Sequence, residues 1–124
     1  MQLTIKAREI QDIVILELNG RVVAGEEVDT VRRMIHDLVD HNHRKISLNL
    51  DQVARIDSTG IGMLVEAVIY TVKQGGRLNL YMVPRLVRSI LTTHHLLQAF
   101  EVYSSEAEAI AGFEKPAPSP GMLA

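Results

Sequence analysis

Apolar residues along this chain recur with two different spacings, which alternate from one segment to the next. Where every second residue is apolar, the spacing predicts a strand with one buried face; where apolar residues recur every three or four positions, it predicts an amphipathic helix. By this criterion, strands are expected at 3–7, 13–18, 45–50, 78–82 and 99–103, and helices at 25–39, 58–74, 84–91 and 104–113. The alternation predicts an α/β fold, with a single mixed β-sheet of about five strands, four helices and right-handed crossovers.

Glycine, proline and serine residues indicate where several of these elements begin and end. The strand at 3–7 is expected to lie at an edge of the sheet, and the second strand to close at Asn19-Gly20. The second helix is expected to stop at Gly75-Gly76. Pro84 suits the first turn of the third helix, and Ser104 or Ser105 can cap the last one.

The segment Arg55-Ile56-Asp57-Ser58-Thr59-Gly60-Ile61-Gly62 places two small hydroxyl residues after an acid at the start of a predicted helix. Asp57 or Ser58 is expected to cap that helix, and Gly60 and Gly62 are expected to let it pack closely. The helix would bury one stripe of apolar residues, formed by Ile61, Leu64, Val65, Val68, Ile69 and Val72. The pattern alone favours a purely structural role for this segment.

The hydroxyl of Ser58 is nevertheless expected near the surface, where a serine kinase could reach it. Unpaired backbone N–H groups and the positive end of the helix dipole make a helix N-terminus favourable for a phosphate. A phosphate would add about −1.5 to −2 charge; neighbouring Asp57 would repel it, and an acidic or apolar partner would lose contact. Phosphorylation of Ser58 is therefore a candidate release switch that requires no change of fold.

Several catalytic and binding motifs are incomplete in this sequence. A serine-hydrolase elbow has the pattern G-x-S-x-G, and Ile56 stands where the first glycine is needed to relieve crowding next to Ser58. Gly60-Ile61-Gly62 lacks the third glycine of a dinucleotide-binding loop, and no Gly-Lys-Ser/Thr sequence is present. The sequence therefore indicates neither an enzyme nor a nucleotide-binding protein.

The histidines include two close pairs, which could suggest a metal site. His41 and His43 form one pair, and His94 and His95 form the other. No H-x-x-x-H pair lies on a helix face, and neighbouring histidines rarely converge on one ion. His41 and His43 are better explained as partners for the C-terminal end of the preceding helix. No metal and no other cofactor is expected.

Composition narrows the class of protein further. With 124 residues, 47% of them hydrophobic, the chain is expected to form one domain over residues 1–113, followed by a Pro-rich disordered tail at 114–124. A formal net charge of −2 and an aromatic content of 4% give no reason to expect nucleic-acid or membrane binding. The lack of cysteine, of a signal-like N-terminal segment and of a long apolar run makes a cytoplasmic protein the expectation.

Four segments, in their order and at their spacings, resemble one known family. They are Lys45–Leu50, Asp57–Gly62, Gly75–Leu80 and Phe100–Tyr103, the last followed by Glu106–Ala109. Together with the order of elements, they resemble the STAS domain over residues 3–113. The resemblance is closer to the bacterial anti-anti-sigma factors, which are anti-sigma factor antagonists.

This resemblance implies a partner-switching mechanism without catalysis by the chain itself. The unphosphorylated domain would bind an anti-sigma factor, commonly a serine kinase with a histidine-kinase-like ATP fold, and so free a sigma factor. The kinase would phosphorylate Ser58 and break the complex, which a PP2C-type phosphatase would restore. Residues 20–25 and the first turn after Ser58 would form the partner-binding surface, with contacts from Asp57, Ser58, Thr59, Gly60, Ile61, Gly20, Arg21 and Val23.

One departure from the family leaves the identity of the partner open. Many members have Gly-x-Leu-Asp after the second strand, whereas Gly20-Arg21-Val22-Val23 lacks the acid. The alternative is a STAS domain that is never phosphorylated, acting as a scaffold or as an accessory subunit of a lipid or anion transporter. Ser58 favours the switch, since a residue unable to accept a phosphate would favour a scaffold.

Overall fold

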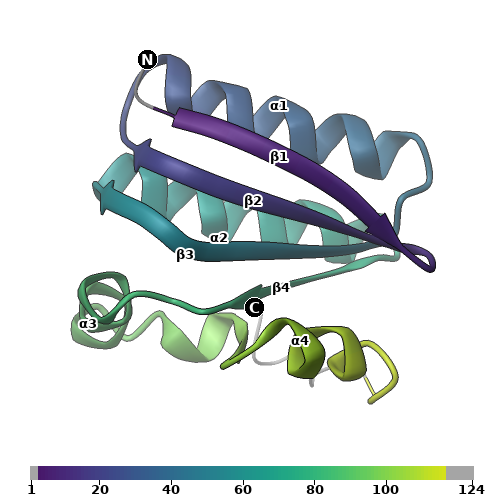
Figure 1. Ribbon diagram of the computed structural model, residues 1–124. Coiled ribbons are helices and arrows are strands. Elements are labelled where there is room, and N and C mark those ends of the chain that lie inside the picture. The colour runs from purple at the N-terminus through teal and green to yellow at the C-terminus, as the bar shows by residue number, and fades with distance from the viewer. Residues whose placement is uncertain (1–2, 117–124) are drawn as a thin grey trace.

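The computed structural model describes residues 3–116 and arranges them as one five-stranded sheet with helices on both faces (Figure 1). The strands lie in the order β1-β2-β3-β4-β5; β1 pairs antiparallel with β2, and the other neighbours are parallel. The elements are β1 (Leu3–Ile10), β2 (Ile13–Val22), α1 (Glu26–Asp40), β3 (Lys45–Ile56), α2 (Ser58–Lys73), β4 (Arg77–Tyr81), α3 (Arg85–Thr93), the 3-10 helix η1 (Leu97–Ala99), β5 (Glu101–Tyr103) and α4 (Glu106–Gly112). The predicted mixed sheet, order of elements and edge position of β1 are confirmed. The tail predicted at 114–124 lies, from 117 onward, outside the described residues.

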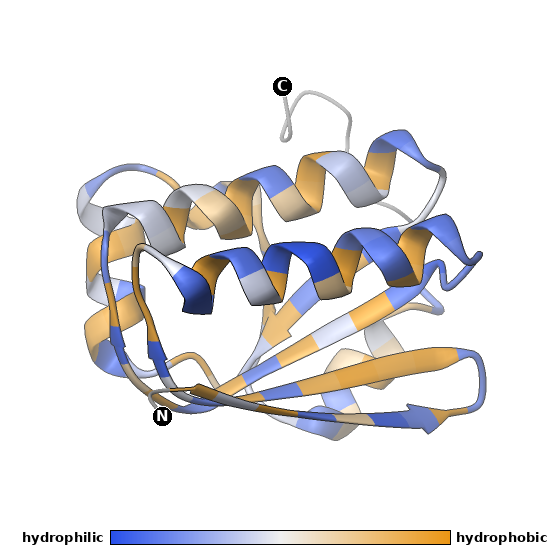
Figure 2. Cartoon of the chain, turned by 90° about the horizontal axis from the view of Figure 1, so that it is seen from above, coloured by the Kyte–Doolittle hydropathy of each residue, from blue (hydrophilic) through white to orange (hydrophobic). Residues whose placement is uncertain are grey.

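The two faces of the sheet are covered to different extents. α1 and α2 lie side by side over one face, and Figure 2 shows both helices on the same side of the strands. Side chains from these helices, from α3 and from the sheet form the main core; its fully buried members include Leu16, Leu18, Ile35, Ile46, Leu48, Leu50, Leu64 and Leu80. α4 covers part of the other face through a smaller cluster, made of Ile13, Ile15, Tyr81, Ala109 and Phe113. The start of β2 is therefore buried on both faces, which explains its unbroken apolar run.

Hydrogen bonds from two strand residues fix α4 against the sheet. The fully buried side chain of Asn79 donates from Nδ2 to the carbonyl of Ala109 at 3.0 Å. The guanidinium of Arg77 donates to both carboxylate oxygens of Glu101 and to the carbonyl of Gly112. Because these buried polar groups have partners, α4 covers this part of the sheet without leaving donors or acceptors unsatisfied.

Polar side chains join α1 to α2 at their partly exposed seam. The rings of His36 and Tyr70 stack with their centroids 3.8 Å apart. Nε2 of His36 lies 3.0 Å from a carboxylate oxygen of Glu66, and the hydroxyl of Tyr70 donates to Asp40 at 2.5 Å. These contacts fix the two helices relative to each other and so help to position the start of α2.

β2 and β3 are longer than the apolar pattern indicates. β2 does not close at Asn19-Gly20 but continues to Val22, and β3 ends at Ile56 rather than at residue 50. Val22 and Ile56 pair with each other after two register shifts in the β2–β3 ladder. The shifts and the polar residue Asp51 interrupt the alternation, so the pattern does not reveal the extension. The extension carries both strands to the edge where α2 begins.

Three further expectations differ in detail from the structure. β5 is shorter than the predicted strand, because η1 occupies residues 97–99. Pro84 is the N-cap of α3 rather than a residue of its first turn. Ser105, not Ser104, caps α4, and its hydroxyl oxygen accepts a hydrogen bond from the N–H of Glu108 at 3.2 Å.

α2 buries a broader face than the predicted stripe. Leu64 and Val68 are buried as expected, but Val72 is 39% exposed, whereas Thr71 is fully buried. α2 packs against both the sheet and α1, so residues on two adjoining sides of the helix are covered. Thr71 is accommodated because its hydroxyl donates to the carbonyl of Ala67 at 2.7 Å.

The packing of α2 predicts a large difference between two leucine substitutions. Leu64→Ala removes a fully buried side chain and is expected to lower the free energy of unfolding by about 2–5 kcal/mol, because transfer energy is lost and a cavity forms. The matched control is Leu86, which is 60% exposed; Leu86→Ala is expected to change that free energy by less than about 0.5 kcal/mol. Urea denaturation measures both, and equal effects would contradict the packing described.

Candidate functional site

Asp57 connects two backbone segments at the edge where β2 and β3 end. It is the N-cap of α2, with an extended backbone, and its Oδ1 accepts a hydrogen bond from the N–H of Gly60 at 2.8 Å. Its Oδ2 accepts from the N–H of Ala24 at 2.9 Å, and its own N–H donates to the carbonyl of Val22 at 3.4 Å. One side chain therefore both caps α2 and holds the β2–α1 loop against the start of that helix.

The hydrogen bonds to Asp57 also favour its ionised form. Those from the N–H groups of Ala24 and Gly60 lower the pKa of Asp57 below its usual value, because they stabilise the ionised carboxylate. A negative charge therefore already lies at the positive end of the α2 dipole. The sequence suggests free N–H groups for a phosphate here, but Asp57 occupies that of Gly60.

Ser58 and Thr59 are the first two residues of α2, and both are exposed. Of the two candidates for the cap, the structure selects Asp57, so the hydroxyl of Ser58 is not used for that purpose. An exposed hydroxyl at the first helical position is accessible to a modifying enzyme. A phosphate attached there would lie next to the Asp57 carboxylate and would be repelled toward solvent.

Gly60 allows α2 to approach the end of β2 closely. A Cβ atom at this position would lie 2.3 Å from the carbonyl oxygen of Val22 and 2.7 Å from Cγ1 of Ile56. Gly62 was expected to serve the same purpose, but this expectation is wrong, because a Cβ there would meet nothing within 4 Å. Only the first of the two glycines is required by packing.

The remaining residues of the predicted partner-binding surface differ in their exposure. Ile61 is 5% exposed and packs in the main core, and Gly60 is also buried, so both shape the surface from beneath. Gly20 and Arg21 belong to β2 rather than to a loop, and Val23, the first residue after β2, is half-buried. The exposed members of the predicted surface are Arg21, Ser58 and Thr59.

Two residues at this edge are not indicated by the sequence pattern. Ala24 contributes only its backbone N–H, which any residue except proline could supply, so no sequence signal marks it. Arg55 is exposed and is the Cα partner of Arg21 across β2 and β3. Val53 and Ile56, which precede and follow Arg55 in the sequence, are apolar and buried. They are the one sequence signal that β3 continues past residue 50.

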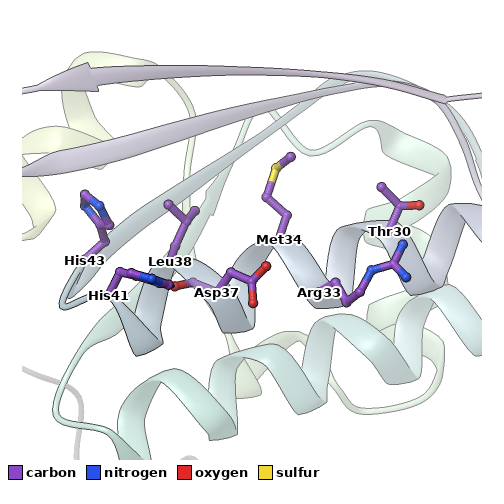
Figure 3. Close-up of a pocket in the computed structure, with 7 residues that line it drawn as sticks. All are labelled: Thr30, Arg33, Met34, Asp37, Leu38, His41 and His43. Atoms are coloured by element: carbon purple, nitrogen blue, oxygen red, sulfur yellow. The ribbon is translucent and has the colours of Figure 1, made fainter.

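A groove of about 480 Å³ follows α1 from Thr30 to the C-terminal end of the helix (Figure 3). Met34 and Leu38 point from α1 toward the strands, and the full lining is Thr30, Arg33, Met34, Asp37, Leu38, His41 and His43. A second groove of about 300 Å³ lies between β1 and the start of α1 and shares Thr30 and Met34 with the first. The mixed lining matches no particular ligand chemistry.

Neither a metal-binding cluster nor a membrane-spanning helix is found within residues 3–116. No three side chains of the metal-ligating types converge in this part of the chain, and none of its helices has the length and apolar character to cross a bilayer.

His41 meets the C-terminal end of α1 as predicted, with its Nδ1 at 2.7 Å from the carbonyl oxygen of Asp37.

Comparison with known proteins identifies this architecture. Residues 4–109 match the model of the STAS domain, whereas the search of curated protein sequences gives no significant match. The Thermotoga maritima protein TM1081 superposes with a TM-score of 0.83 at 23% identity, covering 90% of this chain and 95% of its own. The Bacillus anti-sigma factor antagonist SpoIIAA, in its unphosphorylated form, superposes with a TM-score of 0.72 at 17% identity, covering 91% and 100%. The murine anion transporter Slc26a9 superposes with a TM-score of 0.70 at 15% identity, covering 86% of this chain and 18% of the transporter. These likenesses establish a shared fold.

The close approach at Gly60 predicts opposite effects for two glycine substitutions. Gly60→Ala is expected to lower the free energy of unfolding by about 1–3 kcal/mol, because the new methyl group would overlap the backbone of β2. Gly62→Ala is expected to raise it by about 0.5–1 kcal/mol, because alanine is the better helix former and the space is open. Thermal and urea denaturation measure both; changes of the same sign would contradict the described contact.

The charge of Asp57 predicts a stability contribution that depends on pH. Asp57→Ala is expected to lower the free energy of unfolding by about 1 kcal/mol at neutral pH, because the cap of α2 is lost. The folded-state pKa of Asp57 is lowered, so its charge contributes fully above the unfolded-state pKa and is lost as pH falls through the folded-state pKa. The difference between wild type and variant should therefore shrink on acidification. Urea titrations at neutral and acidic pH measure it, and a difference independent of pH would rule out the carboxylate charge as its cause.

Proposed function

This chain belongs to the STAS domain family, and we propose that it is an anti-sigma factor antagonist that works by partner switching. In its unphosphorylated form it binds an anti-sigma factor that is also a serine kinase, and thereby frees a sigma factor in the cytoplasm. Phosphorylation of Ser58 releases the complex, and a PP2C-type phosphatase restores it. The observation that carries the proposal is the exposed Ser58 at the first position of α2, directly after the capping Asp57. The chain contributes no catalytic step.

The comparison with SpoIIAA supports a switch on this fold. SpoIIAA is an anti-sigma factor antagonist whose structure is known in an unphosphorylated and a phosphorylated form. Both forms superpose on this chain to a similar extent, with TM-scores of 0.72 and 0.70. A phosphate on Ser58 is accordingly proposed to act at the surface and not by rebuilding the sheet or its helices.

The physical basis of release is the charge that a phosphate brings to a docked surface. It adds about −1.5 to −2 charge at the point where the partner rests, and an unfavourable charge in an interface costs several kcal/mol. A cost of about 3 kcal/mol lowers affinity about 100-fold. Asp57 strengthens the effect, because its charge repels the phosphate away from the helix terminus and toward the partner.

A scaffold or transporter subunit is the second candidate function. It is supported by the likeness to the anion transporter Slc26a9, whose chain carries this fold as a small part of its length. In that case Ser58 would serve only as an exposed helix residue, and its phosphate occupancy would not respond to growth conditions. Peptide mapping of the protein from its native host, under growth and under stress, separates the two functions.

The proposed switch predicts distinct effects for substitutions at two exposed serines. Ser58→Ala should retain binding to the cognate anti-sigma factor, whereas Ser58→Asp should weaken it at least about tenfold through interface charge. Ser89 is exposed on α3, and Ser89→Asp is the matched control, expected to leave the dissociation constant unchanged. Calorimetric titration with each recombinant anti-sigma factor encoded in the source genome measures these constants. Binding of the Ser58→Asp protein as tightly as wild type would contradict the switch.

A further inference from the structure

One face of the sheet carries a row of exposed polar and basic residues at the edge next to Ser58. Val22 and Ile56 face the main core, so the residues before them, Arg21 and Arg55, face the opposite side. Asn19 on β2 is the Cα partner of Thr4 on β1 and of Gln52 on β3. We call this row the cationic strip; its members are Thr4, Lys6, Asn19, Arg21, Gln52 and Arg55, and all six are exposed.

α4 leaves the cationic strip uncovered. The cluster that α4 forms with the sheet involves Ile13 and Ile15 at the start of β2 and Tyr81 on β4. The strip lies at the other end of β2 and β3, and Figure 1 shows α4 beneath the half of the sheet that is remote from the arrowheads of these strands. This part of the sheet face is therefore open to a partner.

The two arginines of the strip are an unfavourable arrangement in the isolated chain. Arg21 and Arg55 are direct Cα partners on adjacent strands, and like charges at such positions repel each other. Neither they nor Lys6 form an ion pair with a carboxylate of residues 3–116. An acidic surface placed over them would relieve the repulsion, so the strip is complementary to a negatively charged partner.

The acids close to the strip do not neutralise it. Glu17, the Cα partner of Lys6, forms its ion pair with Arg8 at 3.2 Å, and Arg8 also pairs with Glu106. Asp51 accepts a hydrogen bond from Nε2 of Gln52 at 2.8 Å and contributes one negative charge beside the strip. The three basic side chains Lys6, Arg21 and Arg55 therefore leave this surface with an excess of positive charge.

We propose that the cationic strip receives an acidic surface of the anti-sigma factor, an inference that rests on the proposed function. The strip is continuous with the edge that holds Ser58, because Arg55 lies in the strand that leads to it and Arg21 precedes Val22, which accepts a hydrogen bond from Asp57. A partner seated on Ser58 and extending over the edge would meet both arginines. A phosphate on Ser58 would then repel the acidic surface of the partner and compete with it for the arginines.

The charges on the other side of Ser58 favour a protein over a polyanion. The first turn of α1 carries Glu26, Glu27 and Asp29, and α1 begins directly after the loop that Asp57 holds. A nucleic-acid duplex or an anionic bilayer presents uniform negative charge and would be repelled there. A protein surface can place acids over the strip and avoid them opposite α1.

The association rate at varied salt concentration tests the strip. The probe is the recombinant anti-sigma factor that binds the wild-type chain, and the variants are Arg21→Glu and Arg55→Glu. Each is expected to lower the association rate constant about tenfold at low salt, and the difference should diminish as salt rises from about 0.05 to about 0.5 M, because screening increases. The matched control Arg33→Glu, at an exposed arginine on α1, should change the rate less than twofold. Rates equal to wild type for both strip variants would overturn the proposal.

The possible outcomes separate this inference from the function on which it rests. If Ser58→Asp weakens binding while both strip variants bind as wild type, only the acidic contact is wrong. If no anti-sigma factor binds the wild-type chain, the proposed function fails and the inference fails with it. A short DNA duplex and phosphatidylcholine vesicles with or without phosphatidylserine serve as further probes. A further outcome is that the strip variants lose binding to the DNA duplex or to the vesicles while they still bind the anti-sigma factor as the wild type does. That result would assign the strip to a polyanion and overturn the proposal.

Discussion

The position of Ser58 depends on one carboxylate that is shared between two backbone segments. Val22 and Ile56 form the last pair of the β2–β3 ladder, and beyond them the two chains separate into a loop and a helix. Beyond this pair, the carboxylate of Asp57 connects the two chains. One oxygen accepts a hydrogen bond from Ala24 in the loop, and the other accepts one from Gly60 in α2. Each oxygen accepts one hydrogen bond, whereas a capping hydroxyl would have to accept both at one oxygen. The loop, the first turn of α2 and the edge of the sheet therefore keep one relative arrangement.

This arrangement separates the buried residues that position α2 from the exposed hydroxyl groups on its first turn. Gly60 and Ile61 are buried and fix the approach of α2 to the sheet, while Ser58 and Thr59 remain exposed on the same turn. A chemical change at the exposed hydroxyl can alter the charge of the surface while the buried contacts beneath it persist. A large change in surface charge therefore requires little change of conformation, because no packed residue has to move.

The sequence indicates those features that depend on local pattern. Every predicted strand and helix exists, and the longer ones bury a face whose period of two or of 3.6 residues is visible in the apolar positions. The start of α2 is similarly local, because a short acidic or hydroxyl side chain before an apolar helix is a recognised start signal; the choice of Asp57 over Ser58 came only from the structure. The end of β3 was missed, because Asp51 breaks the alternation and register shifts are not periodic. The bond from Ala24 to Asp57 and the pairing of Arg21 with Arg55 join distant segments, and no local pattern encodes such contacts.

The strand order β1-β2-β3-β4-β5 never reverses, and this has a consequence for what the edge at Ser58 can recognise. In open α/β sheets, small ligands bind in a crevice at the carboxyl ends of the strands, where the order changes direction and neighbouring loops diverge to opposite faces. Within the described sheet, every parallel connection from β2 to β5 advances in the same direction, so no such switch point opens a crevice. A molecule that binds at this edge would therefore contact exposed side chains, such as those of Ser58 and Thr59, rather than enter a crevice at a switch point.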